Sequence, residues 1–200
     1  MGDLAEIHTR DGGRITAHKV IVTVPLNVLN SIEFRPGLSA VKVAAATEGQ
    51  VSQGLKVWMR VAGHVEPFIA LAPGQYPLTM AGYEYEHEGD SILVAFGPDS
   101  SALDVTDLEA VQAALAQWRP DLDLVLVDAH DWTADPLSGE TWSMPRTGQI
   151  STAAEELQRP EGRVHLAGGD YASGWAGFID GAIESGRGTA RRVLTDRAHP

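Results

Sequence analysis

The residues with the clearest chemical potential lie between positions 164 and 194, where a short apolar strand precedes a glycine-rich turn and a long amphipathic helix. They are Gly168, Gly169, Asp170, Trp175, Gly177 and Phe178. The first N–H groups of a helix have no partner within the helix, so a helix start can bind an anion or an electron-rich oxygen. An ordinary closing helix needs only a capping residue there. The extra glycines and rings therefore favour a bulky cofactor lying against the backbone over simple tight packing.

The segment after this turn reads as a helix that starts near Gly177. Its apolar positions recur at helical spacing, and we expect them to face the interior: Ile179, Ala182, Ile183, Gly186, Ala190, Val193 and Leu194. Two glycines inside the helix, Gly181 and Gly186, each cost about 1 kcal/mol relative to alanine. We therefore expect another part of the protein to approach the helix backbone closely at both positions.

The elements that must position this helix can be read from the rest of the chain. Apolar runs predict a hairpin over 4–17 around Asp11-Gly12-Gly13, and strands over 19–25, 54–63, 91–96 and 123–132. Helices are predicted over about 39–48 and from Thr106 or Asp107 to Pro120. Residues 133–149 form a long stretch rich in Gly, Pro, Ser and Thr, the type of loop that often carries function. Together these elements predict a mixed α/β fold.

Composition excludes several classes of function. The net charge of −12 and the lack of a Lys/Arg cluster argue against binding nucleic acid. The chain has no cysteine, which excludes disulfides, thiolate metal sites and a cysteinyl bond to a cofactor. Its seven histidines show no metal-ligand spacing, and no Gly-x-Ser-x-Gly sequence occurs, so metalloenzymes and hydrolases have little support. Without a membrane-length apolar run or a signal peptide, a soluble, cytoplasmic protein is predicted.

The sequence GGDYASGWAGFIDGAIESG, residues 168–186, resembles the C-terminal flavin-binding signature of the flavin-containing amine oxidases, the monoamine and polyamine oxidase type. Two more segments are similar to the same family. Residues 20–45 resemble the strand that leads into the substrate domain, and residues 132–149 resemble the loop that carries one wall of the active site. The resemblance covers nearly the whole chain. It implies the C-terminal part of a two-domain, FAD-dependent amine oxidase fold.

This resemblance implies contacts with FAD. Gly168, Gly169 and Asp170 would lie against its ribityl–pyrophosphate part, and Phe178-Ile179 at the helix start would face the pyrimidine edge of the flavin. A helix N-terminus there stabilises the negative charge that two-electron reduction places on the ring. Trp175 and Gly177 belong to the same signature, and a side chain at Gly177 would intrude on the flavin edge.

Other positions match the family's active site. Trp142 and Phe178 match the two aromatic residues between which the substrate amine passes, and Lys56 matches a lysine that holds a water near flavin N5. Without the family, Lys56 would read as an exposed strand lysine. Trp132 matches an aromatic residue beside the flavin. Thr141 stands where some relatives carry the cysteinyl flavin link, so FAD is expected to bind non-covalently.

The family's Gly-x-Gly-x-x-Gly sequence, which receives the dinucleotide phosphates, has no match in this chain. We therefore expect about the C-terminal half of an amine oxidase, with a partner chain supplying the other half. The expected divisions are an FAD-domain meander and strand (1–36), a substrate-domain portion (37–131), the active-site loop with the strand–turn–helix (132–195) and a tail (196–200).

The resemblance implies oxidation of an amine to an imine by hydride transfer to flavin N5. Water would hydrolyse the imine, and O2 would be reduced to H2O2. Two alternatives stay open: a non-catalytic fragment or interaction module, and a relative of the flavin desaturases or porphyrinogen oxidases. Lys56 and Trp142 favour amine oxidation, whereas the sequence does not distinguish primary amines, polyamines and amino acids.

Overall fold

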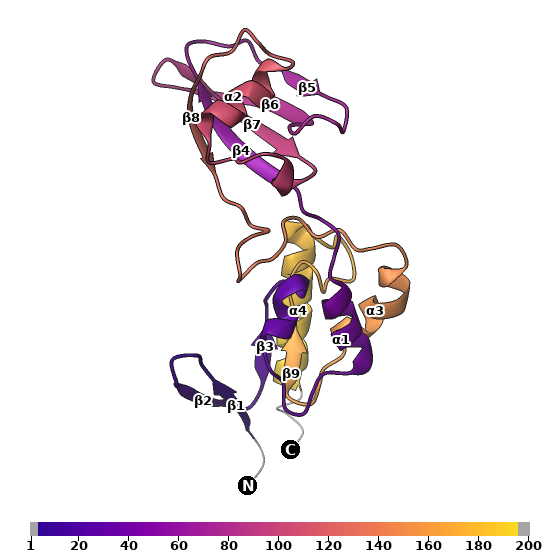
Figure 1. Ribbon diagram of the computed structural model, residues 1–200. Helices are drawn as coiled ribbons and strands as arrows, with labels where there is room; N and C mark the ends of the chain where they lie inside the picture. Colours follow the sequence, from indigo (N-terminus) through magenta and orange to yellow (C-terminus); the bar gives the residue numbers. More distant parts are fainter. Residues whose placement is uncertain (1–3, 196–200) are drawn as a thin grey trace. The chain divides into compact units, whose positions relative to one another are not determined.

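The computed structural model describes residues 4–195, which divide into two compact units (Figure 1). Unit 1 combines the chain up to Val51 with the chain from Leu137 onward, and unit 2 is Ser52–Pro136. Unit 2 is therefore an insertion within unit 1. The predicted tail, 196–200, lies outside the described residues.

Unit 1 contains two small sheets. In the first, β1 (Ala5–His8) and β2 (Arg14–Ala17) form the predicted antiparallel hairpin. In the second, β3 (Val20–Val22) pairs in parallel with β9 (Val164–Leu166), so that Val20 lies opposite Val164. The β-branched run over 19–25 and the apolar run before the glycine-rich turn thus become neighbouring strands.

Four helices accompany these sheets in the described part of unit 1. They are the 3-10 helix η1 (Leu26–Ser31), α1 (Ala40–Glu48), α3 (Gln149–Gln158) and α4 (Ile179–Thr195). Ser39 caps α1, because its hydroxyl accepts a hydrogen bond from the Lys42 N–H. Apolar side chains of β3, β9, η1, α1 and α3 and of the turn after β9 form one core: Val22, Leu26, Leu29, Ala45, Ala46, Ala153, Leu157, Leu166 and Tyr171.

The buried cation of Lys42 links α1 to the turn before β9. The Lys42 side chain is completely buried, and its Nζ donates to Glu161 Oε1 at 2.8 Å and to the Arg159 carbonyl at 2.7 Å. The hydrogen bond from Lys42 is the main reason why the pKa of Glu161 lies below its ordinary value. Charges this deep are tolerated only when their partners are in place.

Replacing Lys42 with methionine is expected to lower the free energy of unfolding by about 1–3 kcal/mol, because two acceptors lose their donor. Urea unfolding followed by circular dichroism measures the change. Arg187→Met, which removes an exposed cation of α4 in the same unit, is the control. Equal unfolding midpoints for the two variants would contradict a stabilising role for this ion pair.

The terminal helix packs differently from its sequence prediction. Its buried residues are the small ones, Gly181 and Thr189. The stripe that we expected to be buried is largely exposed, with Ile179 at 81%, Ile183 at 52% and Leu194 at 65% exposure. A Cβ at Gly186 would have no atom within 4 Å, so the close approach expected there is wrong. Small side chains let α4 lie close to the rest of unit 1, and its wide apolar stripe faces outward.

Unit 2 is built on an antiparallel sheet of five strands in the order β5-β6-β7-β4-β8. The strands are β4 (Leu55–Val61), β5 (Ile69–Leu71), β6 (Met80–His87), β7 (Asp90–Gly97) and β8 (Leu124–Ala129). After the short η2 (Ser100–Ala102), helix α2 (Leu108–Ala116) packs its buried side chains Val111 and Leu115 into the core of this unit. Asp107 caps α2 by accepting from the N–H groups of Glu109 and Ala110.

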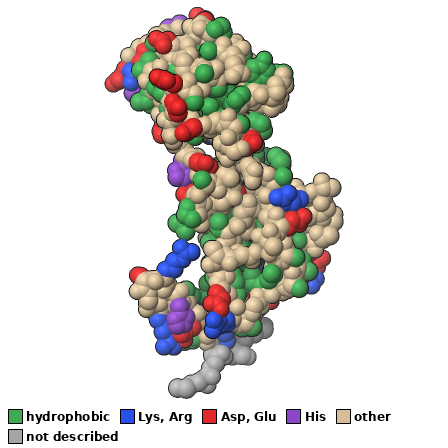
Figure 2. All heavy atoms as spheres, in the orientation of Figure 1, with side chains coloured by type: hydrophobic (Ala, Val, Ile, Leu, Met, Phe, Trp, Pro, Cys, Tyr) green, Lys and Arg blue, Asp and Glu red, His purple; other side chains and the backbone are tan. Residues whose placement is uncertain are grey.

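The division of the chain differs from the predicted one. Residues 37–51, which the sequence analysis grouped with the substrate domain, belong to unit 1, because α1 packs against η1 and α3. Residues 132–136 belong to unit 2. Acidic side chains are spread over the face of unit 2 that Figure 2 shows. Within residues 4–195, none of the helices has the length and apolar character that crossing a membrane requires.

Candidate functional site

The turn between β9 and α4 closes on itself. Gly168 has a φ of +143°, a conformation that favours glycine, and the Gly177 N–H donates to the Gly169 carbonyl at 3.1 Å. The chain from 169 to 177 is therefore a compact loop. Phe178 follows this loop directly and precedes Ile179, the first residue of α4. The helix therefore begins two residues later than the sequence predicted.

This loop presents uncovered rings beside the start of α4. Trp175 is 71% exposed and Phe178 is 63% exposed, and their rings meet edge to face with centroids 6.0 Å apart. Trp175 also has a φ of +52°, which is uncommon for a residue with a side chain. Together with Ile179, these side chains form an apolar surface of the kind that a ligand or a partner covers.

The loop that carries Trp142 touches this surface. A Cβ on Gly177, whose φ is +80°, would lie 3.0 Å from the Ser143 carbonyl oxygen. The space that a flavin needs was the expected reason for this glycine, and that expectation stays a prediction. Among the protein atoms, those nearest to such a Cβ belong to Ser143, so Gly177 also allows two protein segments to approach closely. Trp142 and Phe178 each lie one residue away from this contact.

Asp170 is engaged by protein groups. Its Oδ2 accepts a hydrogen bond from the Leu26 N–H at 2.8 Å, and its carboxyl group is also hydrogen-bonded to that of Glu140. Burial, followed by the negative charge of Asp170, raises the pKa of Glu140 to about 8. Asp170 was expected to contact FAD, whereas Glu140, one glutamate in an irregular loop, was not expected to belong to the site. No sequence pattern could have paired two residues 30 positions apart.

Two predicted site residues lie in unit 2. Lys56 is exposed on β4, and its Nζ lies 4.5 Å from the ring centre of Trp58 and 5.7 Å from that of Phe96. Trp132 is half exposed and packs its ring edge to face against His130, with centroids 4.2 Å apart. Both residues thus sit in aromatic surroundings that suit an apolar or cationic neighbour.

Comparison with known proteins decides the family. The family model described as flavin-containing amine oxidoreductase matches residues 2–194. The chain belongs to this family. That membership confirms the family and the cofactor, FAD, that the sequence analysis predicted.

Individual relatives of this amine oxidoreductase chain are substantially longer than it is. It is 37% identical to pseudooxynicotine dehydrogenase from Pseudomonas sp. over 94% of its own length and 38% of the relative. It is 36% identical to (S)-6-hydroxynicotine oxidase from Paenarthrobacter nicotinovorans over 96% of its length and 45% of the relative. The chain therefore spans less than half of these curated relatives.

Solved structures confirm the fold class. Cyclohexylamine oxidase from Brevibacterium oxydans IH-35A superposes with a TM-score of 0.81 at 17% identity, covering 98% of this chain and 47% of the oxidase. At this identity the likeness establishes the fold alone. The mixed α/β architecture expected from the sequence is thus the architecture of one part of an amine oxidase.

The residues around the start of α4 fit part of a flavin cofactor. Uncovered apolar side chains there, Trp175, Phe178 and Ile179, suit a flat aromatic ring system. The first-turn N–H groups of α4 suit the electron-rich edge of such a ring. In contrast, the chain contains no Gly-x-Gly-x-x-Gly sequence to receive dinucleotide phosphates. This fit therefore concerns the ring of FAD, and the expected contact of Gly168, Gly169 and Asp170 with its ribityl–pyrophosphate part stays a prediction.

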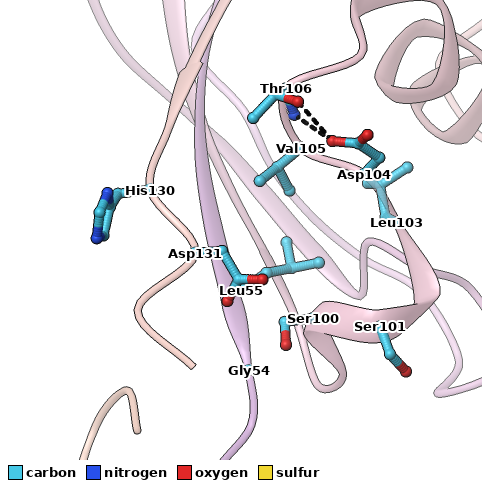
Figure 3. A pocket seen from close by; sticks show the side chains of 10 residues that line it. All are labelled: Gly54, Leu55, Ser100, Ser101, Leu103, Asp104, Val105, Thr106, His130 and Asp131. Carbon is cyan, nitrogen blue, oxygen red and sulfur yellow. Dashed lines mark hydrogen bonds between the residues drawn. The ribbon is translucent and has the colours of Figure 1, made fainter. Parts of the chain in front are cut away.

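Unit 2 contains a separate cavity of 420 Å³, drawn in Figure 3. Its acidic groups already have local partners. Asp104 accepts from the N–H and the hydroxyl of Thr106 at 2.9 and 2.7 Å, and Asp131 accepts from the Thr133 and Ala134 N–H groups, both at 3.0 Å. These hydrogen bonds stabilise turns of unit 2.

Proposed function

We propose that this chain forms the part of an FAD-dependent amine oxidoreductase that carries the aromatic substrate cage and the ring-facing end of the flavin site. The observation that carries the proposal is the pair of uncovered rings, Trp175 and Phe178, at the first turn of α4 in a chain of this family. An exposed apolar surface of this size is covered by a ligand or by a partner, and membership of a flavin-containing family favours the flavin ring as that ligand.

Roles for the chain's own residues follow from this proposal. When bound, FAD supplies the hydride acceptor for the amine α-carbon, and we propose O2, reduced to H2O2, as the final electron acceptor. Trp142 and Phe178 orient the neutral amine and exclude water from it. The first-turn N–H groups of α4 stabilise negative charge at the flavin edge. Lys56 holds a water beside the reacting centre. We propose that FAD is bound non-covalently, since this chain has no cysteine that could form a cysteinyl link.

The substrate that we propose is a nicotine-like amine. The support is the identity of 37% and 36% to proteins named for pseudooxynicotine and 6-hydroxynicotine. One of these is named a dehydrogenase and the other an oxidase, so the electron acceptor must be measured separately. Turnover of 6-hydroxynicotine with stoichiometric peroxide is the expected result. Turnover with a dye acceptor but without peroxide would contradict O2 as the acceptor.

We propose that a further polypeptide segment or a partner chain supplies the remaining part of the enzyme. That part would cover apolar surface that is exposed in this chain. The apolar stripe of α4, formed by Ile179, Ile183 and Leu194, is exposed in this chain. The two-stranded β3–β9 sheet is also smaller than an independently stable parallel sheet. Both features support completion of unit 1 by a dinucleotide-binding half.

Complementation tests this function. The chain is produced together with the part of (S)-6-hydroxynicotine oxidase that it does not cover, and the purified complex is examined for flavin absorbance. We expect a yellow complex that is bleached by 6-hydroxynicotine. Phe178→Asp should co-purify without flavin, because a carboxylate would face the electron-rich ring edge. A complex that contains both parts but no flavin would contradict the proposal.

Replacing Lys56 with methionine should slow flavin reduction or reoxidation while FAD stays bound. The substitution removes the ammonium group that we propose holds a water, yet it keeps a chain of similar length on the two rings. An effect of about 10²-fold or more is typical for a lost proton-handling group. Stopped-flow absorbance measures both half-reactions, and Lys56→Arg is the charge-retaining control. Wild-type rates in both half-reactions would leave Lys56 as an ordinary strand residue.

A further inference from the structure

Glu140 is a buried carboxylic acid at the centre of the loop that carries Trp142. Its side chain is almost completely buried, with 3% exposure. Its Oε2 accepts a hydrogen bond from the Asn27 N–H at 3.0 Å, and its carboxyl group is also hydrogen-bonded to the Gln50 side chain and to Asp170. Glu140 thus joins η1, the segment that follows α1 and the glycine-rich turn through one side chain.

The contact between Glu140 and Asp170 requires a proton. An ionised carboxylate can only accept hydrogen bonds, so two carboxyl groups bond to each other only when one of them is protonated. Burial and the nearby Asp170 charge act in the same direction, and both raise the pKa of Glu140. Asp170 keeps its second partner, the Leu26 N–H. Glu140 therefore keeps its proton at neutral pH, and its carboxyl group can donate that proton in the hydrogen bond to Asp170.

The other titratable groups around Glu140 and Asp170 do not neutralise the negative charge of this pair. The Tyr171 hydroxyl donates to the Val24 carbonyl at 2.8 Å, and burial raises its pKa, so Tyr171 stays neutral. Asp170 and Gln50 line a cavity of 660 Å³ in unit 1, through which water can reach the pair. Glu155 and Glu156 of α3 and Arg159, which follows this helix, also line the cavity, and Arg159 pairs with both glutamates.

The residues flanking Glu140 are fixed by the same neighbours. The Asn27 side-chain amide donates to the Gly139 carbonyl at 3.0 Å, and the Met144 N–H donates to Gln50 Oε1 at 3.0 Å. Ser143 lies against Gly177. Only Thr141, Trp142 and Ser143 separate Glu140 from the Met144 bond, so the position of the Trp142 ring depends on these anchors.

We propose that Glu140 is a positioning residue, whose proton-sharing bond to Asp170 holds the Trp142 loop against the glycine-rich turn that precedes Phe178. This inference rests on the proposed function for its catalytic meaning, because Trp142 and Phe178 form the proposed amine cage. Loss of the shared proton would place two negative charges in a buried contact, and their repulsion would separate the loop from the turn. Trp142 would then move relative to Phe178.

The test follows Trp142 directly. The full chain is labelled with fluorotryptophan, which gives signals for its five tryptophans, and Trp142→Phe identifies the signal of interest. We expect the Trp142 signal to shift as the pH passes through about 8. In Glu140→Gln the shift should disappear, because an amide can donate to Asp170 at every pH. The exposed Glu155→Gln on α3 is the matched control, and it should keep the wild-type titration.

Two results would overturn the proposal: a Trp142 signal that stays constant with pH, or an identical titration in Glu140→Gln. If a variant self-associates, hydrogen–deuterium exchange of residues 137–146 replaces the fluorine signal. Exchange in this segment should rise steeply in Glu140→Ala and stay low in Glu140→Gln. Both readouts need no cofactor, so failure to bind FAD would contradict the proposed function without affecting this result.

Discussion

Replacing Gly181 with alanine is expected to destabilise unit 1 by about 3 kcal/mol, near the upper end of the range for overpacking. A Cβ at this position would lie 2.2 Å from the Trp175 carbonyl oxygen and 2.8 Å from that of Gly174. Both neighbours are backbone atoms, which cannot turn away as a flexible side chain can. The segment that presents Trp175 and Phe178 must therefore shift as a whole.

The sign of this effect is the reverse of the usual one. In an open helix position, alanine is more stable than glycine by up to about 1 kcal/mol. Gly186 provides that reference within the same helix, because a Cβ there would meet no atom within 4 Å. Gly186→Ala is therefore expected to be neutral or slightly stabilising. Thermal unfolding of the two variants, followed by tryptophan fluorescence, measures the difference in stability. Equal changes in melting temperature would contradict close backbone packing at Gly181.

Stability is also expected to fall as the pH rises from about 4.5 to about 8. The folded state raises the pKa of Glu140 above its ordinary value of 4.5. A group of this kind contributes its full stability below the unfolded pKa, where it is protonated in both states. That contribution is lost as the pH rises through the folded pKa, because the unfolded chain then releases the proton more readily. The loss is specific to unit 1, where Glu140 and Asp170 meet.

Urea unfolding at several pH values between about 5 and about 9 tests this expectation. Glu140→Gln should flatten the dependence and exceed the wild type in stability at the alkaline end. Glu161 affects stability in a different pH range, because the hydrogen bond from Lys42 lowers its pKa. Its contribution to folding stability is lost as the pH falls below the ordinary pKa of a glutamate. A wild-type profile that stays level above pH 5, or a slope that survives in Glu140→Gln, would count against the shared proton.

Local patterns in the sequence predicted the main elements well. The β-branched run over 19–25 and the alternating run over 54–63 contain β3 and β4, and the proline at 120 follows α2 as expected. Strand β6 and helix α3 were missed. The first is interrupted by polar residues on its exposed side, and the second begins after Gly148 without a capping side chain. These elements depend on tertiary packing more than on local sequence.

The site was predicted less completely, for two physical reasons. Periodicity identifies an apolar stripe such as Ile179, Ile183 and Leu194, but it does not say which surface covers that stripe. In this chain α4 packs through Gly181 and Thr189 instead. The pairing of Glu140 with Asp170 could not be predicted from the sequence either. The burial that raises the pKa of Glu140 arises only when the loop folds onto the turn.

The insertion of unit 2 between β3 and β9 has a consequence for folding. Val20 and Val164 must find each other across 144 residues, and closing so long a loop is entropically costly. Unit 2 reduces this cost because its first and last strands are antiparallel neighbours, with Val57 opposite Ala129. Once unit 2 is folded, the two connections back to unit 1 start from adjacent strands. The loop that must close before β3 and β9 can pair is then effectively short. The strand order of unit 2 therefore governs how readily unit 1 forms.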